Sequence, residues 1–235
     1  MIIATAMNLR RFALIAALLL FAVTANAAKK EAPPLADIAS YPMLEKHDKE
    51  LVTIAADPYD TRARANFFRI DYVGHSILPI RIIIRNDSDH ALDLSAVRIQ
   101  LEPKNGGKLP AALPEEIHRR VFHVKNPAQQ KRLPFPTPSF STPVDKKILQ
   151  DDTDFSFRAS TIAPHTTASG FLFYDIADLD DDYPLRGADL YFKMIKTSDG
   201  KGSTELFPFT LPFDKYLATK SSAPPSGGHV VKTDK

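Results

Sequence analysis

The sequence contains no cysteine and no tryptophan, and only nine of its 235 residues are glycine. Without cysteine, disulfide bonds, cysteine-ligated zinc sites and thiol nucleophiles are excluded. The glycines form neither a phosphate-binding loop nor the G-x-G-x-x-G pattern of dinucleotide-binding folds. A G-x-S-x-G nucleophile elbow is missing as well. These absences leave no motif for catalysis or for a cofactor, so we expect a protein that is not an enzyme and uses no cofactor.

A basic surplus is also missing from most of the chain. The formal net charge is +2, and the excess comes from Arg10 and Arg11, the only charged residues among the first 27. Residues 28–235 therefore carry 28 basic and 28 acidic side chains. Nucleic-acid binding requires a basic surplus gathered on one face, so we expect no nucleic-acid partner.

Long apolar runs are scarce after the N-terminus. The twelve residues Phe12–Val23 are uninterruptedly apolar, they follow Arg10 and Arg11, and Ala25–Ala27 fits the small-x-small pattern before a signal peptidase site. Such a run is too short to cross a bilayer core of about 30 Å as a helix. We predict a signal peptide over residues 1–27, a secreted or periplasmic location, and no stable membrane anchor after cleavage.

Alternation of apolar and polar residues dominates the rest of the chain and predicts half-buried antiparallel strands. The segment 170–176 is apolar on both faces, which favours a central strand. Asp199-Gly200 suits a hairpin turn, and Pro208 predicts that the strand containing it lies at an edge or is broken. We expect strands at residues 67–73, 78–85, 97–102, 155–160, 170–176, 188–196 and 204–213, with a further one at 51–55.

Residues 114–150 interrupt this strand pattern. Pro114 followed by Glu115 and Glu116 indicates the start of a helix, which we predict over residues 114–125. A proline-rich crossover follows at residues 133–143. We predict an N-terminal arm at 28–48, one β domain at 49–217 with the 114–150 insertion, and a disordered tail at 218–235.

Seven or eight short strands with turns between them indicate a single antiparallel β-sandwich of immunoglobulin-like type, with an open barrel or jelly roll as alternatives. Ile82–Leu92 (IIIRNDSDHAL) and Gly170–Asp175 (GFLFYD) are similar to the immunoglobulin-like domains of exported bacterial proteins, including the telokin-like and FxLYD types. Glu205–Leu217 resembles a group of exported proteins of unknown function. The resemblance implies a fold and an envelope setting, and no catalytic residues.

The insertion carries the first candidate site. Its basic side chains and two phenylalanines could contact an anionic partner, such as an acidic envelope protein, a glycan or a lipid headgroup. The alternative is a solvated helix face balanced by Glu115 and Glu116. The candidate partner-binding residues are Arg119, Arg120, Lys125, Lys131, Arg132, Phe135 and Phe140.

An acidic loop is the second candidate. Carboxylates close together in a loop could supply some of the oxygens that Ca²⁺ requires, although the spacing is not that of an EF-hand and solvated turns are the simpler interpretation. The candidate metal ligands are Asp178, Asp180, Asp181 and Asp182. Asp151, Asp152 and Asp154 are expected to act as turn or cap residues before a strand.

Three functions remain open from the sequence. The leading interpretation is a noncatalytic exported protein that binds another envelope component through the insertion, since binding residues concentrate in loops held on rigid sheets. The second is a hydrolase or carbohydrate-active accessory domain that uses the acidic loop. The third is a purely structural envelope protein.

Overall fold

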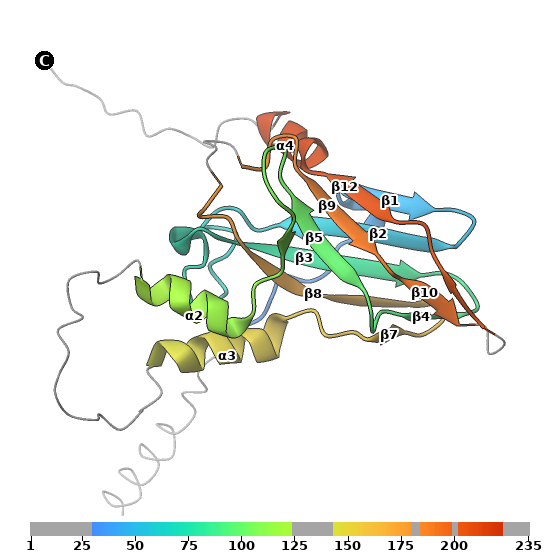
Figure 1. The fold of residues 1–235 in the computed structure, drawn as a ribbon, viewed down its shortest axis with the longest axis horizontal. Helices are drawn as coiled ribbons and strands as arrows, with labels where there is room; N and C mark the ends of the chain where they lie inside the picture. Colours follow the sequence, from blue (N-terminus) through green and yellow to red (C-terminus); the bar gives the residue numbers. More distant parts are fainter. Residues whose placement is uncertain (1–29, 124–142, 180–183, 199–201, 223–235) are drawn as a thin grey trace, which may run out of the picture. The chain divides into compact units, whose positions relative to one another are not determined.

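The computed structural model describes residues 30–123, 143–179, 184–198 and 202–222. The chain divides into two compact units, residues 1–31 and residues 32–235. Only residues 30 and 31 of the first unit are described, and all of the described helices and strands belong to the second unit. In the second unit, three four-stranded sheets with antiparallel pairing make up most of the regular structure (Figure 1). The predicted β-rich class is therefore confirmed.

The first sheet has the strand order β1-β2-β3-β8. Its strands are β1 (Met43–His47), β2 (Val52–Pro58), β3 (Ile77–Asn86) and β8 (Thr166–Asp175). The predicted strands at 51–55, 78–85 and 170–176 are thus confirmed. The expectation that 170–176 is central is wrong, because β8 stands last in the strand order.

Two shorter sheets, of order β12-β9-β5-β6 and β11-β10-β4-β7, contain the remaining strands. The predicted strand at 188–196 is split in two because Met194 adopts the left-handed φ of 64°. Ser198 pairs with Ser203 across the expected hairpin, whose turn lies outside the described residues. The predicted break at Pro208 is confirmed between β11 and β12. The strands are β4 (Ala91–Asp93), β5 (Arg98–Glu102), β6 (Leu109–Pro110), β7 (Thr161–Ile162), β9 (Asp189–Lys193), β10 (Lys196–Ser198), β11 (Ser203–Glu205) and β12 (Phe209–Pro212).

The first sheet and the β12-β9-β5-β6 sheet share the main apolar core, and we call them the first and the second layer. Ile54 of β2 and Ile82 of β3 belong to one buried cluster with Leu101 of β5, Leu190 of β9 and Phe209 of β12. Burial of apolar side chains is the dominant favourable term in folding. With twelve strands in the described residues, the molecule contains more strands than the seven or eight expected.

The other face of β3 is covered, not solvated as its alternating pattern predicted. Ile83 packs with Ala55 and Ile38 in a separate buried cluster. Arg81 is only 7% exposed and donates a hydrogen bond to the carbonyl of Pro33. The chain before β1 therefore lies over this face, which a single strand's sequence pattern does not show.

Both predicted ends of the domain need correction. The expected arm at 28–48 contains the 3₁₀ turn η2 (Ile38–Ser40) and strand β1, whose Met43 is fully buried. The expected tail begins inside helix α4 (Phe213–Ser222), and residues 223–235 lie outside the described part. The arm thus belongs to the packed domain because Met43 joins its main cluster, and residues 218–222 belong to it because they continue α4, whose Tyr216 packs in the same cluster.

The predicted strand at 67–73 is wrong, although the side chains on its predicted apolar face are buried. Phe68 and Tyr72 are buried, but this segment is a series of turns that ends in the 3₁₀ turn η3 (Val73–His75). The backbone N–H of Arg69 donates to the Asp151 carboxylate, so it is not available for a strand ladder. A partner distant in sequence decided the backbone here.

The predicted strand at 155–160 is also wrong. Helix α3 (Pro143–Phe155) runs into it, and the chain then touches β8 through one isolated bridge between Ser156 and Phe171. Asp151, expected in a turn, lies inside this helix, where its fully buried carboxylate accepts hydrogen bonds from the Arg69 guanidinium and the Tyr72 hydroxyl. Asp152 and Asp154 of the same helix pair with Arg158 and Arg69. Within the described ranges, no helix has both the length and the apolar character to cross a membrane.

Candidate functional site

The candidate site lies where the edges of the two layers meet. The short strand β6 pairs with β5, and two residues later the N–H of Ala112 donates to the carbonyl of Phe173 in β8 at 2.7 Å. Residues 109–112 therefore connect the second layer to the edge of the first. Helix α2 (Pro114–His123) begins directly after this connection.

Two contacts fix the position of α2. At its start, the N–H of Leu113 donates to the Glu116 carboxylate at 2.8 Å, which is half of a capping box. Ile117 and Val121, one turn apart, are both 3% exposed and pack in an apolar cluster with Ile148 of α3. The predicted helix is confirmed as far as residue 123. Because this face is buried, Arg119 and Arg120 are held outside it, at the helix surface.

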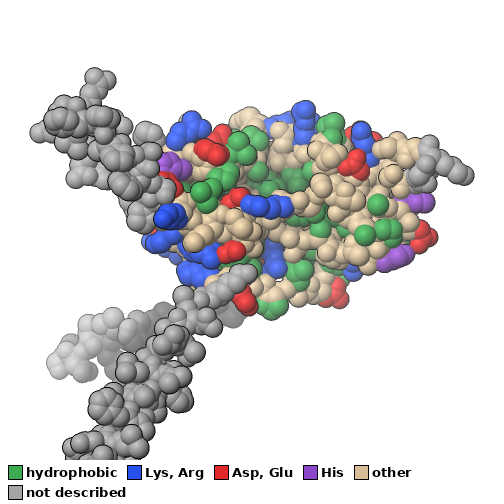
Figure 2. Space-filling model, turned by 90° about the horizontal axis from the view of Figure 1, so that it is seen from below, with side chains coloured by type: hydrophobic (Ala, Val, Ile, Leu, Met, Phe, Trp, Pro, Cys, Tyr) green, Lys and Arg blue, Asp and Glu red, His purple; other side chains and the backbone are tan. Residues whose placement is uncertain are grey.

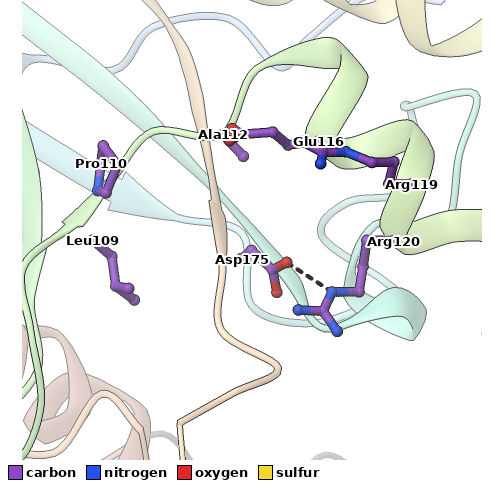
Figure 3. A pocket seen from close by; sticks show the side chains of 7 residues that line it. All are labelled: Leu109, Pro110, Ala112, Glu116, Arg119, Arg120 and Asp175. Carbon is purple, nitrogen blue, oxygen red and sulfur yellow. Dashed lines mark hydrogen bonds and ion pairs between the residues drawn. The ribbon is translucent and has the colours of Figure 1, made fainter. Parts of the chain in front are cut away.

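A pocket of about 500 Å³ opens between α2 and the connection. We call it the α2 pocket, and Figure 3 shows its lining. The β6 side supplies small apolar groups, α2 supplies charged ones, and the end of β8 supplies a carboxylate. Its lining residues are Leu109, Pro110, Ala112, Glu116, Arg119, Arg120 and Asp175.

Arg120 is the best-anchored cation of the pocket. Its Nε donates to Asp175 at 2.7 Å, and its Nη2 donates to Asp178 at 2.9 Å. The hydrogen bond to Asp175 raises the pKa of Arg120, partial burial opposes this effect, and the contact with Asp178 adds to it. The guanidinium therefore stays charged at every physiological pH and points in a fixed direction.

The two carboxylates on Arg120 differ in their support. Asp175 is 32% exposed, ends strand β8, and accepts a second hydrogen bond from the N–H of Ala177. Asp178 is 89% exposed and follows in the turn after the strand. Asp175 therefore belongs to the rigid frame, whereas Asp178 is held by an ion pair of the exposed kind, which contributes little to stability.

Arg119 is the other pocket cation. It is exposed, and the described part of the chain gives it no ion pair. Lys146 and Lys147 of α3 are exposed too, and α3 is joined to α2 by a contact between the His118 imidazole and the Asp145 carboxylate. Figure 2 shows Lys and Arg side chains at the end where Figure 1 places these two helices, with Asp and Glu side chains among them. Together α2 and α3 carry four Lys and Arg and six Asp and Glu, so the positive charge is local to the exposed face of Arg119.

The structure shows where two of the predicted partner contacts lie. Arg119 and Arg120 line the α2 pocket. The interpretation that Glu115 and Glu116 balance these cations is not the arrangement found, because Arg120 pairs with Asp175 and Asp178 and Glu116 caps the helix. The remaining predicted contacts lie outside the described residues, as does the crossover at 133–142; they are Lys125, Lys131, Arg132, Phe135 and Phe140.

The predicted calcium ligands are divided in the same way. Asp178 is described and pairs with Arg120, whereas Asp180, Asp181 and Asp182 lie outside the described residues. In the part that is described, no three His, Asp or Glu side chains cluster as metal ligands would. Calcium binding by this loop stays a prediction, for which a shift of the melting temperature on Ca²⁺ addition is the test.

Sequence reasoning missed the apolar side of the pocket and Asp175. Leu109, Pro110 and Ala112 carry no functional signal in the sequence, and they reach Asp175 only through the pairing of Ala112 with β8. Asp175 could have been noticed as the acidic end of a strand apolar on both faces. Its partner on α2, 55 residues earlier in the chain, could not.

A larger pocket, of about 610 Å³, lies beside α4 and is lined mainly by apolar side chains such as Leu78, Ile176 and Leu217. The acids at its rim already have protein partners, since Asp60 accepts from Lys220 at 2.7 Å and Asp214 accepts from the N–H of Gly187. Its cations are engaged as well, Lys220 with Asp60 and Arg186 in a further contact. Arg119 of the α2 pocket is exposed and has no ion pair within the described residues, so the α2 pocket is the better candidate for a charged ligand.

Neither a protein-family model nor a curated protein matches this sequence. The functional conclusion is therefore drawn from the geometry of the α2 pocket.

Proposed function

We propose that this chain is an exported, noncatalytic β-sandwich protein of immunoglobulin-like type that binds another component of the bacterial envelope through the α2 pocket. The signal-peptide pattern of residues 1–27 supports export. The two packed antiparallel layers are compatible with the immunoglobulin-like type. A rigid sandwich that presents a pocket from its inserted helices is a common arrangement for binding.

One observation carries the proposal: an apolar pocket floor lies next to two arginines, one of them oriented by Asp175. Sites for ligands combine mainly apolar linings with a few placed polar groups. Arginine is also enriched at protein interfaces because its planar guanidinium forms bidentate bonds with carboxylates and packs on apolar groups.

The test compares three forms of the purified protein, each immobilised and exposed to envelope extract of the source organism. Arg119→Glu reverses the exposed pocket cation. Lys215→Glu is the matched control, because Lys215 is an exposed cation of α4 and does not line the α2 pocket. Captured components are identified, purified, and their dissociation constants measured for each form.

We expect a component that binds the unchanged protein and Lys215→Glu alike and binds Arg119→Glu at least tenfold more weakly. Equal binding to all three forms would show that the contact surface lies elsewhere. Failure of the unchanged protein to retain any component would contradict the binding role.

A further inference from the structure

We infer that the α2 pocket recognises an acidic segment of a partner protein, and that Asp178 occupies the place of the partner's carboxylate on Arg120 while the pocket is empty. This inference rests on the proposed function and specifies its ligand. It also gives Asp178 a role as an internal competitor.

The two carboxylates on Arg120 are not held equally. Asp175 is fixed by the end of β8 and by the N–H of Ala177, and it holds the Nε side of Arg120. Asp178, 89% exposed, holds Nη2. Arginine has five N–H donors in a fixed fork, so a carboxylate arriving from solvent can replace Asp178 without disturbing the bond to Asp175.

The side chains that line the α2 pocket suit one kind of ligand. Leu109, Pro110 and Ala112 offer an apolar surface of small and medium side chains beside the two arginines. An acidic residue flanked by apolar residues on a peptide matches this combination. No aromatic ring belongs to the described lining, although aromatic rings are the usual platform for a sugar ring. The chemistry therefore favours an acidic peptide over a glycan.

The charges of the pocket lining also favour an acidic ligand. Arg120 is held by Asp175 and Asp178, and Glu116 accepts the N–H of Leu113 at the start of α2. Arg119 is exposed, and among the residues that the structure describes it has no ion pair. This positive charge at the pocket attracts a carboxylate from solvent and orients it.

Competition by Asp178 has a calculable effect. The apparent affinity of a ligand is its intrinsic affinity multiplied by the fraction of molecules in which its place is vacant. An exposed ion pair of ordinary strength keeps Asp178 on Arg120 in most molecules, so removing Asp178 should raise the affinity for an acidic peptide about two- to sixfold.

The experiment titrates the purified protein with an N-acetylated peptide of alternating glutamate and leucine, and follows the side-chain Nε resonance of Arg120 by NMR. The same peptide with glutamine in place of glutamate is the ligand control. Five proteins are compared: unchanged, Asp178→Asn, Arg120→Ala, Arg120→Ala with Asp178→Asn, and Glu115→Gln. The last removes one negative charge from α2 at a residue that is not a partner of Arg120. For the two Arg120→Ala proteins, backbone amide resonances of α2 report binding.

We expect the dissociation constant to fall two- to sixfold in Asp178→Asn and to change less in Glu115→Gln. In the Arg120→Ala background, Asp178→Asn should give no gain in affinity, and the glutamine peptide should not bind. Equal gains in Asp178→Asn and Glu115→Gln, or a gain that survives Arg120→Ala, would overturn the competition. Absence of binding to any form at millimolar peptide would overturn the acidic ligand. It would leave the binding role to be judged by the capture experiment, which uses a different ligand source and a different variant.

Discussion

Substitution of Gly170 by alanine should destabilise the protein because this glycine lets two chain segments approach closely. A Cβ at position 170 would lie 2.5 Å from the Cα and 2.6 Å from the backbone nitrogen of Phe157. Neither atom can move without shifting the backbone after α3, whose Phe157 N–H donates to the carbonyl of Phe171 at 2.9 Å. Overpacking costs about 1–3 kcal/mol and a lost hydrogen bond about 1 kcal/mol, so we expect a loss of about 2–4 kcal/mol.

Gly107→Ala is the matched control, because nothing lies within 4 Å of a Cβ at that position. Both substitutions stiffen the unfolded chain equally, by about 0.4–1 kcal/mol, so their difference isolates the clash in the folded state. Equilibrium urea unfolding measures it, and a loss of this size moves the midpoint by about 1 M or more. If the two alanine variants unfold within about 0.5 kcal/mol of each other, the close approach of Phe157 to β8 is not as described.

The remaining predictions concern a buried network, a pair of like charges and the N-terminus. Tyr72→Phe should lower the free energy of unfolding by about 1 kcal/mol in urea titration, because the buried hydroxyl donates to the Asp151 carboxylate at 3.1 Å. Asp189→Asn should raise it by about 0.5 kcal/mol at pH 7, because Asp189 faces Glu102 across the β5–β9 pair. Mass spectrometry of the exported protein should find a mature chain that begins at Ala28.

The Asp189 prediction has a defined pH dependence. Burial raises the pKa of Asp189, and the neighbouring charges of Glu102 and Asp214 raise it further. Because the folded-state pKa lies above the unfolded value, the unfavourable contribution appears as the pH rises through the folded-state pKa and is absent below the unfolded pKa of about 3.9. The gain from Asp189→Asn should therefore vanish in titrations at pH 3. A gain of equal size at both pH values would contradict this electrostatic explanation.

The pocket could be predicted only in part from the sequence. The proline and acids at 114–116 located α2, and Arg119 and Arg120, predicted as partner contacts, line the pocket. The ion pair of Asp178 with Arg120 was not foreseen, because it spans 58 positions. Local spacing contains no information on such a pair.

The sequence by itself determined the β-rich class, the long strands and the start of α2. These features follow from short-range causes: side chains alternate along a strand with period two, and proline with acids favours a helix start. Even where the strand at 67–73 was wrong, the buried side of Phe68 and Tyr72 was right, since apolar side chains are buried whatever the backbone does.

Only the tertiary structure decided which backbone groups pair and which charges meet. Asp151 of α3 takes the N–H of Arg69 and so prevents a strand, and Ala112 bonds to β8 and so forms one wall of the α2 pocket. Each of these contacts joins residues that are tens of positions apart, and each is selected because a buried polar group must find a partner. The sequence names the side chains, and the packing of the two layers selects the partners.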